Sequence, residues 1–167
     1  MKQQLNIRAA TVADVPLLLQ FIRELAAYEK LEHEVTATED SLRRHLFGPR
    51  PAAEAVLAGQ EGEWAGFALF FHNFSTFVGK PGLYLEDLFV RPRFRGRGCG
   101  RALMIYLARL ALQRDCGRFE WAVLDWNQPS LDFYHSLGSL PMSDWTVHRL
   151  SGQALQDLAA RKLPDKS

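Results

Sequence analysis

The chain of 167 residues contains only two cysteines, Cys99 and Cys116, and they do not form a CxxC pair. Two isolated cysteines cannot build a disulfide framework, which excludes the class of small disulfide-rich secreted domains. The sequence has no apolar run of the roughly 20 residues that a membrane helix needs. Its first residues, MKQQLNIRAAT, contain no apolar signal region. We therefore expect a cytoplasmic, reduced setting and no membrane partner.

The chain also has little net charge and no metal-binding pattern. Its net charge of +1 gives no overall field that would attract nucleic acid. Its five histidines lack metal-ligand spacing, and His33-Glu34 has no second histidine at the HExxH position, so we expect no metal. There is no internal repeat or low-complexity linker. With 47% hydrophobic and 23% charged residues, we expect one globular domain over residues 1–167.

Hydrophobic periodicity predicts strands and helices interspersed along the chain. We expect strands at residues 5–8, 52–58, 64–72, 83–90, 119–124 and 145–150. We expect a loop at 75–82 and helices at residues 11–28, 38–47, 102–114, 129–137 and 151–162. This order predicts an α/β fold of the α+β kind, with a mixed sheet and helices on both of its faces.

The stretch from Leu83 to Arg114 is the most informative part of the sequence. It predicts a strand with two carboxylates, an Arg- and Gly-rich turn at 93–101, and a helix. Such a turn directs backbone N–H groups and the positive end of a helix dipole toward one point, which makes an anion site. Arg95 and Arg101 could add charge opposite a pyrophosphate. The alternative is a surface turn with solvated arginines.

The spacing within this turn excludes two nucleotide-binding classes. Gly96, Gly98 and Gly100 alternate, so the motif is not GxGxxG, and no Gly-Lys-Ser/Thr follows as in a P-loop. RNA-binding arginine–glycine tracts are repeated and disordered, whereas this motif is single and embedded between a strand and a helix. Cys99 lies near the helix N-terminus, which lowers a thiol pKa, so a covalent route through this thiol is conceivable.

Three further residues have both a structural and a chemical interpretation. Glu86 and Asp87 are adjacent on a predicted strand, so their side chains are expected on opposite faces, and only one could face a given cleft. The alternative is that both are surface residues at a strand end. Tyr134 is one aromatic residue among many, for which core packing is the default.

R-G-R-G-C-G at residues 95–100 resembles the Arg/Gln-x-x-Gly-x-Gly/Ala signature of the GCN5-related N-acetyltransferases, the GNAT superfamily. The segments LAAYEKLE, YLEDLFV and DWNQPSLDFYHSLG are similar to the diamine acetyltransferase branch, the spermidine/spermine and thialysine type. The resemblance covers most of the chain. It implies the acyl-CoA N-acyltransferase fold with a mostly antiparallel central sheet, acetyl-CoA as co-substrate, and a homodimer.

The resemblance also implies a role for individual residues. Glu86 would accept the proton of the acceptor amine, directly or through water. Tyr134 would donate a proton to the leaving thiolate, a task that suits a phenol with a pKa of about 10. The implied acceptor-binding residues are Tyr28, Glu29, Glu86 and Asp87. The implied coenzyme-binding residues are Leu88, Phe89, Val90, Arg95, Gly96, Arg97, Gly98, Cys99, Gly100, Arg101, Asn127, Ser130 and Tyr134, of which Asn127 could also be a helix N-cap.

We therefore expect an acetyl-CoA-dependent N-acetyltransferase. It would transfer acetyl directly to a primary amine of a small cationic acceptor, such as a diamine, a polyamine or a lysine analogue like thialysine. One alternative is acetylation of a protein N-terminus or lysine, with a peptide groove near the loop at 75–82. Another is a non-catalytic acyl-CoA-binding module, against which the presence of Glu86 and Tyr134 counts.

Overall fold

The computed structural model describes residues 5–162. By their contacts the residues fall into two units, Met1–Ala122 and Val123–Ser167, and each is described by itself. The prediction of a single domain stays a prediction. None of the helices within residues 5–162 is both long and apolar enough to cross a membrane.

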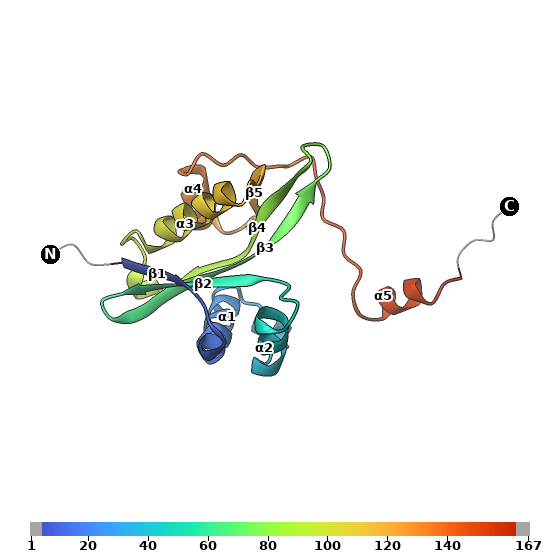
Figure 1. The fold of residues 1–167 in the computed structure, drawn as a ribbon, viewed down its shortest axis with the longest axis horizontal. Helices are drawn as coiled ribbons and strands as arrows, with labels where there is room; N and C mark the ends of the chain where they lie inside the picture. Colours follow the sequence, from blue (N-terminus) through green and yellow to red (C-terminus); the bar gives the residue numbers. More distant parts are fainter. Residues whose placement is uncertain (1–4, 163–167) are drawn as a thin grey trace. The chain divides into compact units, whose positions relative to one another are not determined.

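A five-stranded sheet forms the centre of the first unit (Figure 1). Its strands follow one another in chain order: β1 (Leu5–Ala9), β2 (Glu54–Gln60), β3 (Glu63–Ser75), β4 (Lys80–Val90) and β5 (Arg118–Trp121). Neighbouring strands are antiparallel except β4 and β5, which are parallel. A parallel pair needs a crossover connection, and helix α3 (Cys99–Gln113) supplies it. The predicted mixed, mostly antiparallel sheet is confirmed.

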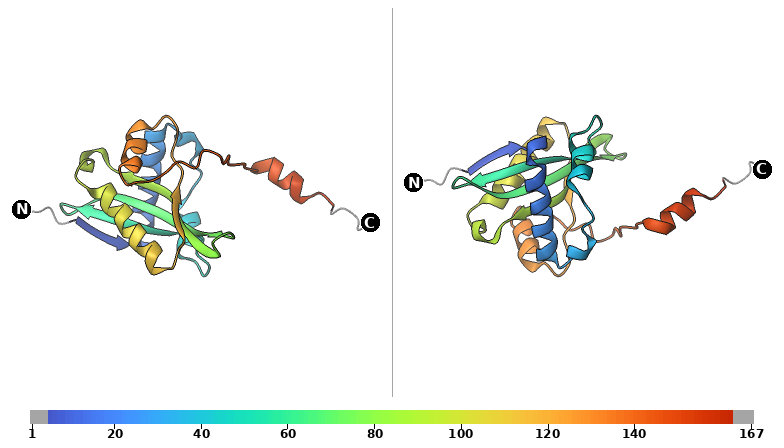
Figure 2. Two further views of the ribbon diagram at one scale, coloured as in Figure 1. Left: turned by 90° about the horizontal axis from the view of Figure 1, so that it is seen from above. Right: turned by 90° about the horizontal axis from the view of Figure 1, so that it is seen from below.

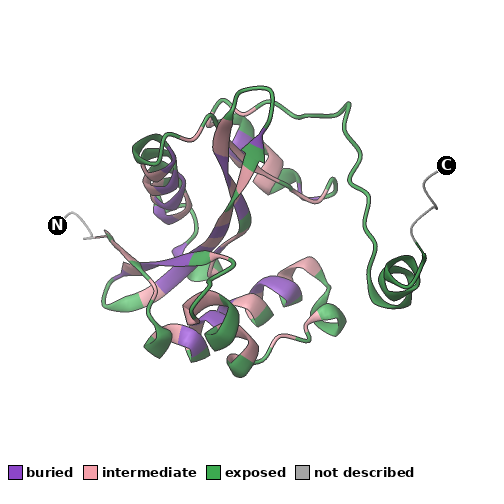
Figure 3. Ribbon diagram, turned by 45° about the vertical axis from the view of Figure 1, so that its right-hand side comes forward, coloured by how far each residue is buried: buried purple, intermediate pink, exposed green. Residues whose placement is uncertain are grey.

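Helices cover both faces of this sheet, as predicted (Figure 2). Helices α1 (Val15–Glu29) and α2 (Glu39–Phe47) lie on one face, and α3 lies on the other. On the α1 face the ring of Phe21 stacks on that of Phe67, with centroids 5.4 Å apart. The buried side chains of this core come from α1 and from three strands (Figure 3): Leu18, Phe21, Leu25, Ala55, Leu57, Phe67 and Phe89.

The start of helix α2 follows from a short polar side chain. Thr38 caps α2, because its hydroxyl accepts a hydrogen bond of 3.1 Å from the backbone N–H of Ser41. The helix expected from Thr11 instead begins at Val15, after a 3-10 turn at Val12–Asp14. Two further 3-10 turns lie at Glu32–Glu34 and Pro92–Phe94.

The loop expected at 75–82 is shorter in the structure. Strand β3 extends to Ser75 and β4 begins at Lys80, so only residues 76–79 form the turn. The backbone N–H of Gly79 donates to the carbonyl oxygen of Ser75 over 2.8 Å, which closes the hairpin. The Gly and Pro residues that suggested a loop are partly contained in a strand.

The second unit contains helices α4 (Gln128–His135) and α5 (Gly152–Ala159). The strand expected at 145–150 is wrong: this segment is exposed and has no ladder partner within residues 5–162. Alternating side chains predict a strand only if another strand receives its backbone hydrogen bonds. For the same reason the strand expected at 119–124 ends early, at Trp121.

Candidate active site

Strand β4 contains a β-bulge at Glu86. Leu69 of β3 pairs with Asp87, and the next residue, Phe70, pairs with Leu85. Glu86 is therefore the additional residue, opposite no partner of its own. Bulges of this kind bend a strand and redirect its side chains, and they are frequent beside active sites.

The bulge brings onto one sheet face residues that simple alternation would separate. Tyr84 pairs with Phe71 and Asp87 pairs with Leu69. Phe71 and Leu69 are two positions apart on β3 and therefore point to the same face. Their partners Tyr84 and Asp87 share that face although three positions separate them. The face is the one covered by α1, because Leu69 packs on its core.

Acidic groups gather at this point of the sheet. Burial, together with the negative charges of Glu86 and Glu29, raises the pKa of the half-buried Asp87 to about 6. Burial and the charge of Glu86 also raise the pKa of Tyr84. Glu86 therefore acts electrostatically on both Asp87 and Tyr84. The expectation that Glu86 and Asp87 point to opposite faces stays a prediction, because the register assigns the bulged Glu86 to neither face.

The last residues of α1 complete this acidic group. Glu29 ends the helix, and burial raises its pKa. The neighbouring Tyr28 is half-buried, with the guanidinium of Arg95 lying 4.5 Å from its ring centroid. The structure thus brings Glu29, Glu86 and Asp87 together, and it joins Tyr28 to the Arg- and Gly-rich turn. No group of His, Cys, Asp or Glu side chains within residues 5–162 is arranged to hold a metal ion.

One edge of β4 loses its neighbour at the bulge. Strand β5 pairs with β4 only from Gly82 to Leu85 and ends at Trp121, whereas β4 continues to Val90. The β4 backbone over residues 86–90 thus has no strand partner on this side among the described residues. An extended ligand that carries amide groups could bind there as an added strand.

The glycine turn follows directly after this free edge. Gly96 and Gly98 have φ angles of 72° and 86°, which only glycine adopts at no steric cost. A Cβ atom at either position would meet no atom within 4 Å, so the turn faces open space. Gly98 is the N-cap of α3, and it offers no side chain to the first N–H groups of the helix. An anion could approach the backbone here, and the predicted anion site stays a prediction.

Most of the five arginines between residues 91 and 101 have partners within the protein. Three are held by acidic residues of α1 and of the β2–β3 hairpin, as the pairs Arg91–Glu24, Arg93–Glu63 and Arg97–Glu61. Arg95 donates from Nε to the carbonyl oxygen of Val90 over 2.8 Å. Arg101, in the first turn of α3, is exposed. These arginines therefore fix the turn against the sheet, and contacts from Arg95, Arg97 and Arg101 to a ligand stay predictions.

Cys99 does not have the environment of a reactive thiol. Its side chain is buried at the start of α3, and burial raises the pKa of the thiol to about 11. The lowered pKa that a helix N-terminus alone would give is absent because the thiol points into the core. A covalent acetyl-cysteine route is not supported.

The predicted residues of the second unit lie on and before α4. Asn127 is buried and caps this helix, accepting a hydrogen bond of 3.3 Å at Oδ1 from the backbone N–H of Ser130. Tyr134 is 9% exposed, and its ring lies 5.3 Å from that of Phe133. The N-cap prediction is confirmed. The contacts of Asn127, Ser130 and Tyr134 with a coenzyme stay predictions.

Sequence reasoning missed two residues on the sheet face that also carries Asp87, namely Tyr84 and Glu120. Glu120 of β5 is the register partner of Tyr84 and shares its face. Its Oε2 accepts a hydrogen bond of 3.0 Å from Asn73 and lies 2.8 Å from Nε of Arg118. The strand expected at 119–124 contains this glutamate among apolar residues, and the glutamate was the available signal that one face is polar.

Comparison with known proteins identifies the class that this fold and site define. The Acetyltransferase (GNAT) family matches residues 19–138, which is more than half of the chain. The chain therefore belongs to the GNAT family and is an N-acetyltransferase. The predicted family is confirmed.

Two curated relatives and two solved structures illustrate the likeness. The thialysine N-epsilon-acetyltransferase of Mus musculus is 36% identical, over 93% of this chain and 98% of the relative. The L-ornithine N5-acetyltransferase of Arabidopsis thaliana is 31% identical, over 90% of this chain and 86% of the relative. An integron cassette protein of V. cholerae has a TM-score of 0.79 at 25% identity, covering 96% of this chain and 99% of its own. An aminoglycoside acetyltransferase from an uncultured soil metagenomic sample, 19% identical over 89% and 95%, shares the fold with a TM-score of 0.71.

Proposed function

We propose that this N-acetyltransferase transfers the acetyl group of acetyl-CoA directly to a primary amine of a small cationic acceptor, such as a diamine, a polyamine or thialysine. The observation that carries the proposal is the bulge at Glu86. It leaves Glu86 and Asp87 beside Glu29 of α1 at the point where β4 loses its β5 neighbour. A cationic acceptor and an extended coenzyme can therefore meet at one position of the strand.

Acetyltransferases of this family use acetyl-CoA as co-substrate. The free edge of β4, with Leu88, Phe89 and Val90, suits the amide groups of the pantetheine arm. The open turn at 96–100 and the first N–H groups of α3 suit the pyrophosphate, with the exposed Arg101 beside them. Both features lie on one continuous segment, so a single extended ligand can use both.

Acetyl transfer requires three events: loss of a proton from the ammonium group, polarisation of the thioester carbonyl, and protonation of the leaving thiolate. A carboxylate at the bulge takes the first proton, with Glu86 beside the incoming amine. A backbone N–H of the β4 edge donates to the thioester oxygen. Tyr134, which is buried on α4, donates a proton to the sulfur.

The acceptor follows from the charge of the site. Glu29, Glu86 and Asp87 offer negative charge, which favours ammonium groups over neutral or acidic acceptors. Two relatives are named for acetylating N-epsilon of thialysine and N5 of L-ornithine. The alternative of a peptide acceptor is weaker, because the loop expected to border a groove is only the turn at 76–79.

Release of CoA thiol across a panel of amines tests the proposal. Thialysine, ornithine, aliphatic diamines, spermidine and a short peptide with a free N-terminus would be compared, and the products identified by mass spectrometry. We expect acetylated small amines and little peptide product. Release with the peptide alone, or with no amine, would contradict the proposed function.

We also propose a homodimer in the cytoplasm, on the family resemblance and on the two unpaired cysteines, Cys99 and Cys116. Light scattering of the purified protein across a range of concentrations tests the dimer. A mass that stays at that of one chain would contradict it.

A further inference from the structure

Asp87 and Glu86 are adjacent carboxylates in very different surroundings. Glu86 is the bulged residue and is exposed. Asp87 is the first residue after the bulge that is paired in the ladder, opposite Leu69, and it is half-buried on the α1 face. Asp87 therefore lies where the free edge of β4 begins, but away from bulk water.

The groups that face Asp87 make its charged form costly. From β4 the neighbour is Glu86 and from α1 it is Glu29, both negative. The carboxylate of Asp87 forms no hydrogen bond or ion pair within residues 5–162. Of the arginines at the end of β4 and in the following turn, Arg95 donates to the Val90 carbonyl and Arg91 donates to Glu24.

Asp14 shows by contrast what a partner does. Its carboxylate accepts hydrogen bonds of 2.7 and 2.8 Å from Arg8, and these bonds hold the pKa of Asp14 well below its ordinary value. Asp87 has burial and two like charges but no cation, so its pKa rises to about 6. A carboxylate with a pKa near the working pH is a better proton acceptor than an ordinary exposed one.

We propose that Asp87, rather than Glu86, accepts the proton that the acceptor ammonium loses before acetyl transfer. This inference rests on the function proposed above. The three carboxylates then have different roles. Asp87 accepts the proton, while Glu86 and Glu29 attract the acceptor and make Asp87 more basic. A cationic ligand supplies the charge that the site lacks.

The step balances as follows. One N–H bond of the ammonium breaks, an O–H bond forms at the Asp87 carboxylate, and the freed electron pair of nitrogen attacks the thioester carbon. The C–S bond then breaks, and the sulfur takes a proton from Tyr134. The nitrogen of the new amide loses its second proton through solvent, which restores the phenol of Tyr134. Asp87 releases its proton to solvent past the exposed Glu86.

The test is the pH dependence of kcat/KM for a small amine, measured on the whole enzyme. The wild-type rate is expected to fall on the acid side with a midpoint near 6. Asp87→Asn should lower the rate by roughly 100-fold or more and abolish this midpoint. Glu86→Gln and Glu29→Gln should each lower the rate less and move the midpoint to lower pH, because each removes a negative charge that raises the Asp87 pKa.

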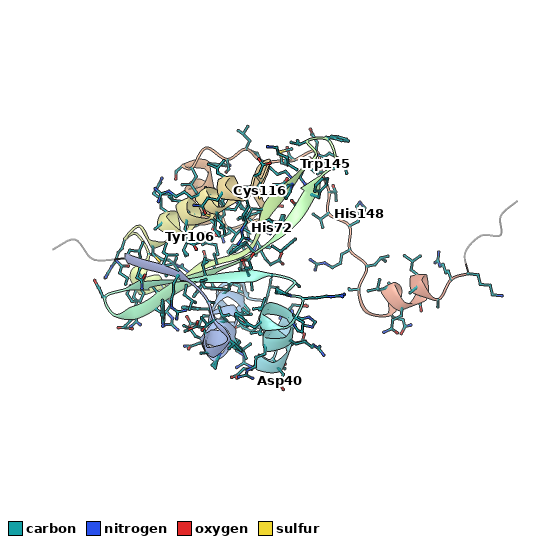
Figure 4. The ribbon with its side chains drawn as sticks, in the orientation of Figure 1. Asp40, His72, Tyr106, Cys116, Trp145 and His148 are labelled. Atoms are coloured by element: carbon teal, nitrogen blue, oxygen red, sulfur yellow. The ribbon has the colours of Figure 1, made fainter. Side chains whose placement is uncertain are left out.

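Asp40→Asn is the matched control. Asp40 lies on α2, with its side chain 96% exposed, at the end of the helix drawn away from the sheet (Figure 4). The Asp40→Asn enzyme should have the same rate and the same acid-side midpoint of kcat/KM as the wild type. Carboxyl titration by NMR, compared between wild type and Asp87→Asn, reports the Asp87 pKa without turnover.

Two outcomes would overturn the inference. In the first, Glu86→Gln abolishes the acid-side midpoint of kcat/KM and recovers activity at high pH, whereas Asp87→Asn only shifts that midpoint. The other is an Asp87 that titrates at the ordinary pKa of an aspartate. Failure of the proposed function is distinguishable, since the wild type would then acetylate no small amine at any pH.

Discussion

Glu29, the last residue of α1, lies close enough to Asp87 of β4 for its charge to raise the pKa of the Asp87 carboxyl. Two carboxylates from distant parts of the sequence thus lie together with no cation between them. Such an arrangement costs folding free energy, and proteins retain it mainly where a ligand uses it.

The stability of the free enzyme should therefore depend on Asp87. Because its folded pKa lies above its unfolded value, the folded state binds more protons, and stability rises as the pH falls through about 6. At pH 8 the ionised carboxylate is unfavourable. We expect Asp87→Asn to unfold at a higher temperature than the wild type at pH 8. The gain in free energy of unfolding should be on the order of 1–3 kcal/mol.

The comparison at two pH values provides the internal control. The difference between Asp87→Asn and the wild type should shrink as the pH approaches 5, where the native carboxyl is mostly protonated. A variant that is less stable than the wild type at both pH values would show that Asp87 makes a favourable contact in its charged form.

The turn at 96–100 should respond to Gly98→Ala in its affinity for acetyl-CoA. A φ of 86° places alanine in the left-handed region, at a cost of about 1–2 kcal/mol. Relief of this strain turns the N–H groups at the start of α3 away from the pyrophosphate. We expect the Kd for acetyl-CoA, measured by calorimetry, to rise by roughly tenfold.

Gly79→Ala separates strain from binding. Gly79 also has a positive φ, 72°, and open space around its Cβ position, but it lies in the β3–β4 turn. It should lose similar stability and keep its affinity for acetyl-CoA. Equal loss of affinity in the two variants would contradict a pyrophosphate site at Gly98.

Tyr134→Phe should lower turnover by roughly 100-fold or more and leave the affinity for acetyl-CoA nearly unchanged. The substitution removes the proton donor but keeps the buried ring that packs beside Phe133. Tyr106→Phe is the control, because Tyr106 is a half-buried phenol on α3 (Figure 4). Normal turnover in Tyr134→Phe would remove the residue from the acid role.

The sequence predicted the parts of this site that depend on local pattern. Gly96 and Gly98 sit at the left-handed positions of the turn, and such positions are recognisable from glycine spacing before a helical pattern. The five helices and five of the six expected strands also followed from periodicity. Each of these features is determined within a few residues of chain.

The bulge at Glu86 could not be predicted in this way. It exists because β3 and β4 pair in two registers on either side of it, and register is a property of two strands rather than one. The same limit explains the error at 145–150, where alternation was present but no partner strand was. It also explains why Glu120 was missed, since its role depends on lying beside Tyr84.

Glu120 gives a prediction about acceptor length. Its Oε2 is held by Asn73 and Arg118, while Oε1 forms no hydrogen bond within residues 5–162. Along the strand, its register partner Tyr84 lies two positions before Glu86, or about 7 Å at the usual rise. An acceptor with a second ammonium group can thus reach Oε1 while its first lies at the bulge.

We expect Glu120→Gln to lower kcat/KM for a short aliphatic diamine by about three- to tenfold, or about 1 kcal/mol, and to change it little for the monoamine of equal chain length. Asp115→Asn, at an exposed carboxylate paired with Lys80, should leave both values unchanged. Equal losses for diamine and monoamine in Glu120→Gln would mean that Glu120 supports the edge strand rather than binding the second charge.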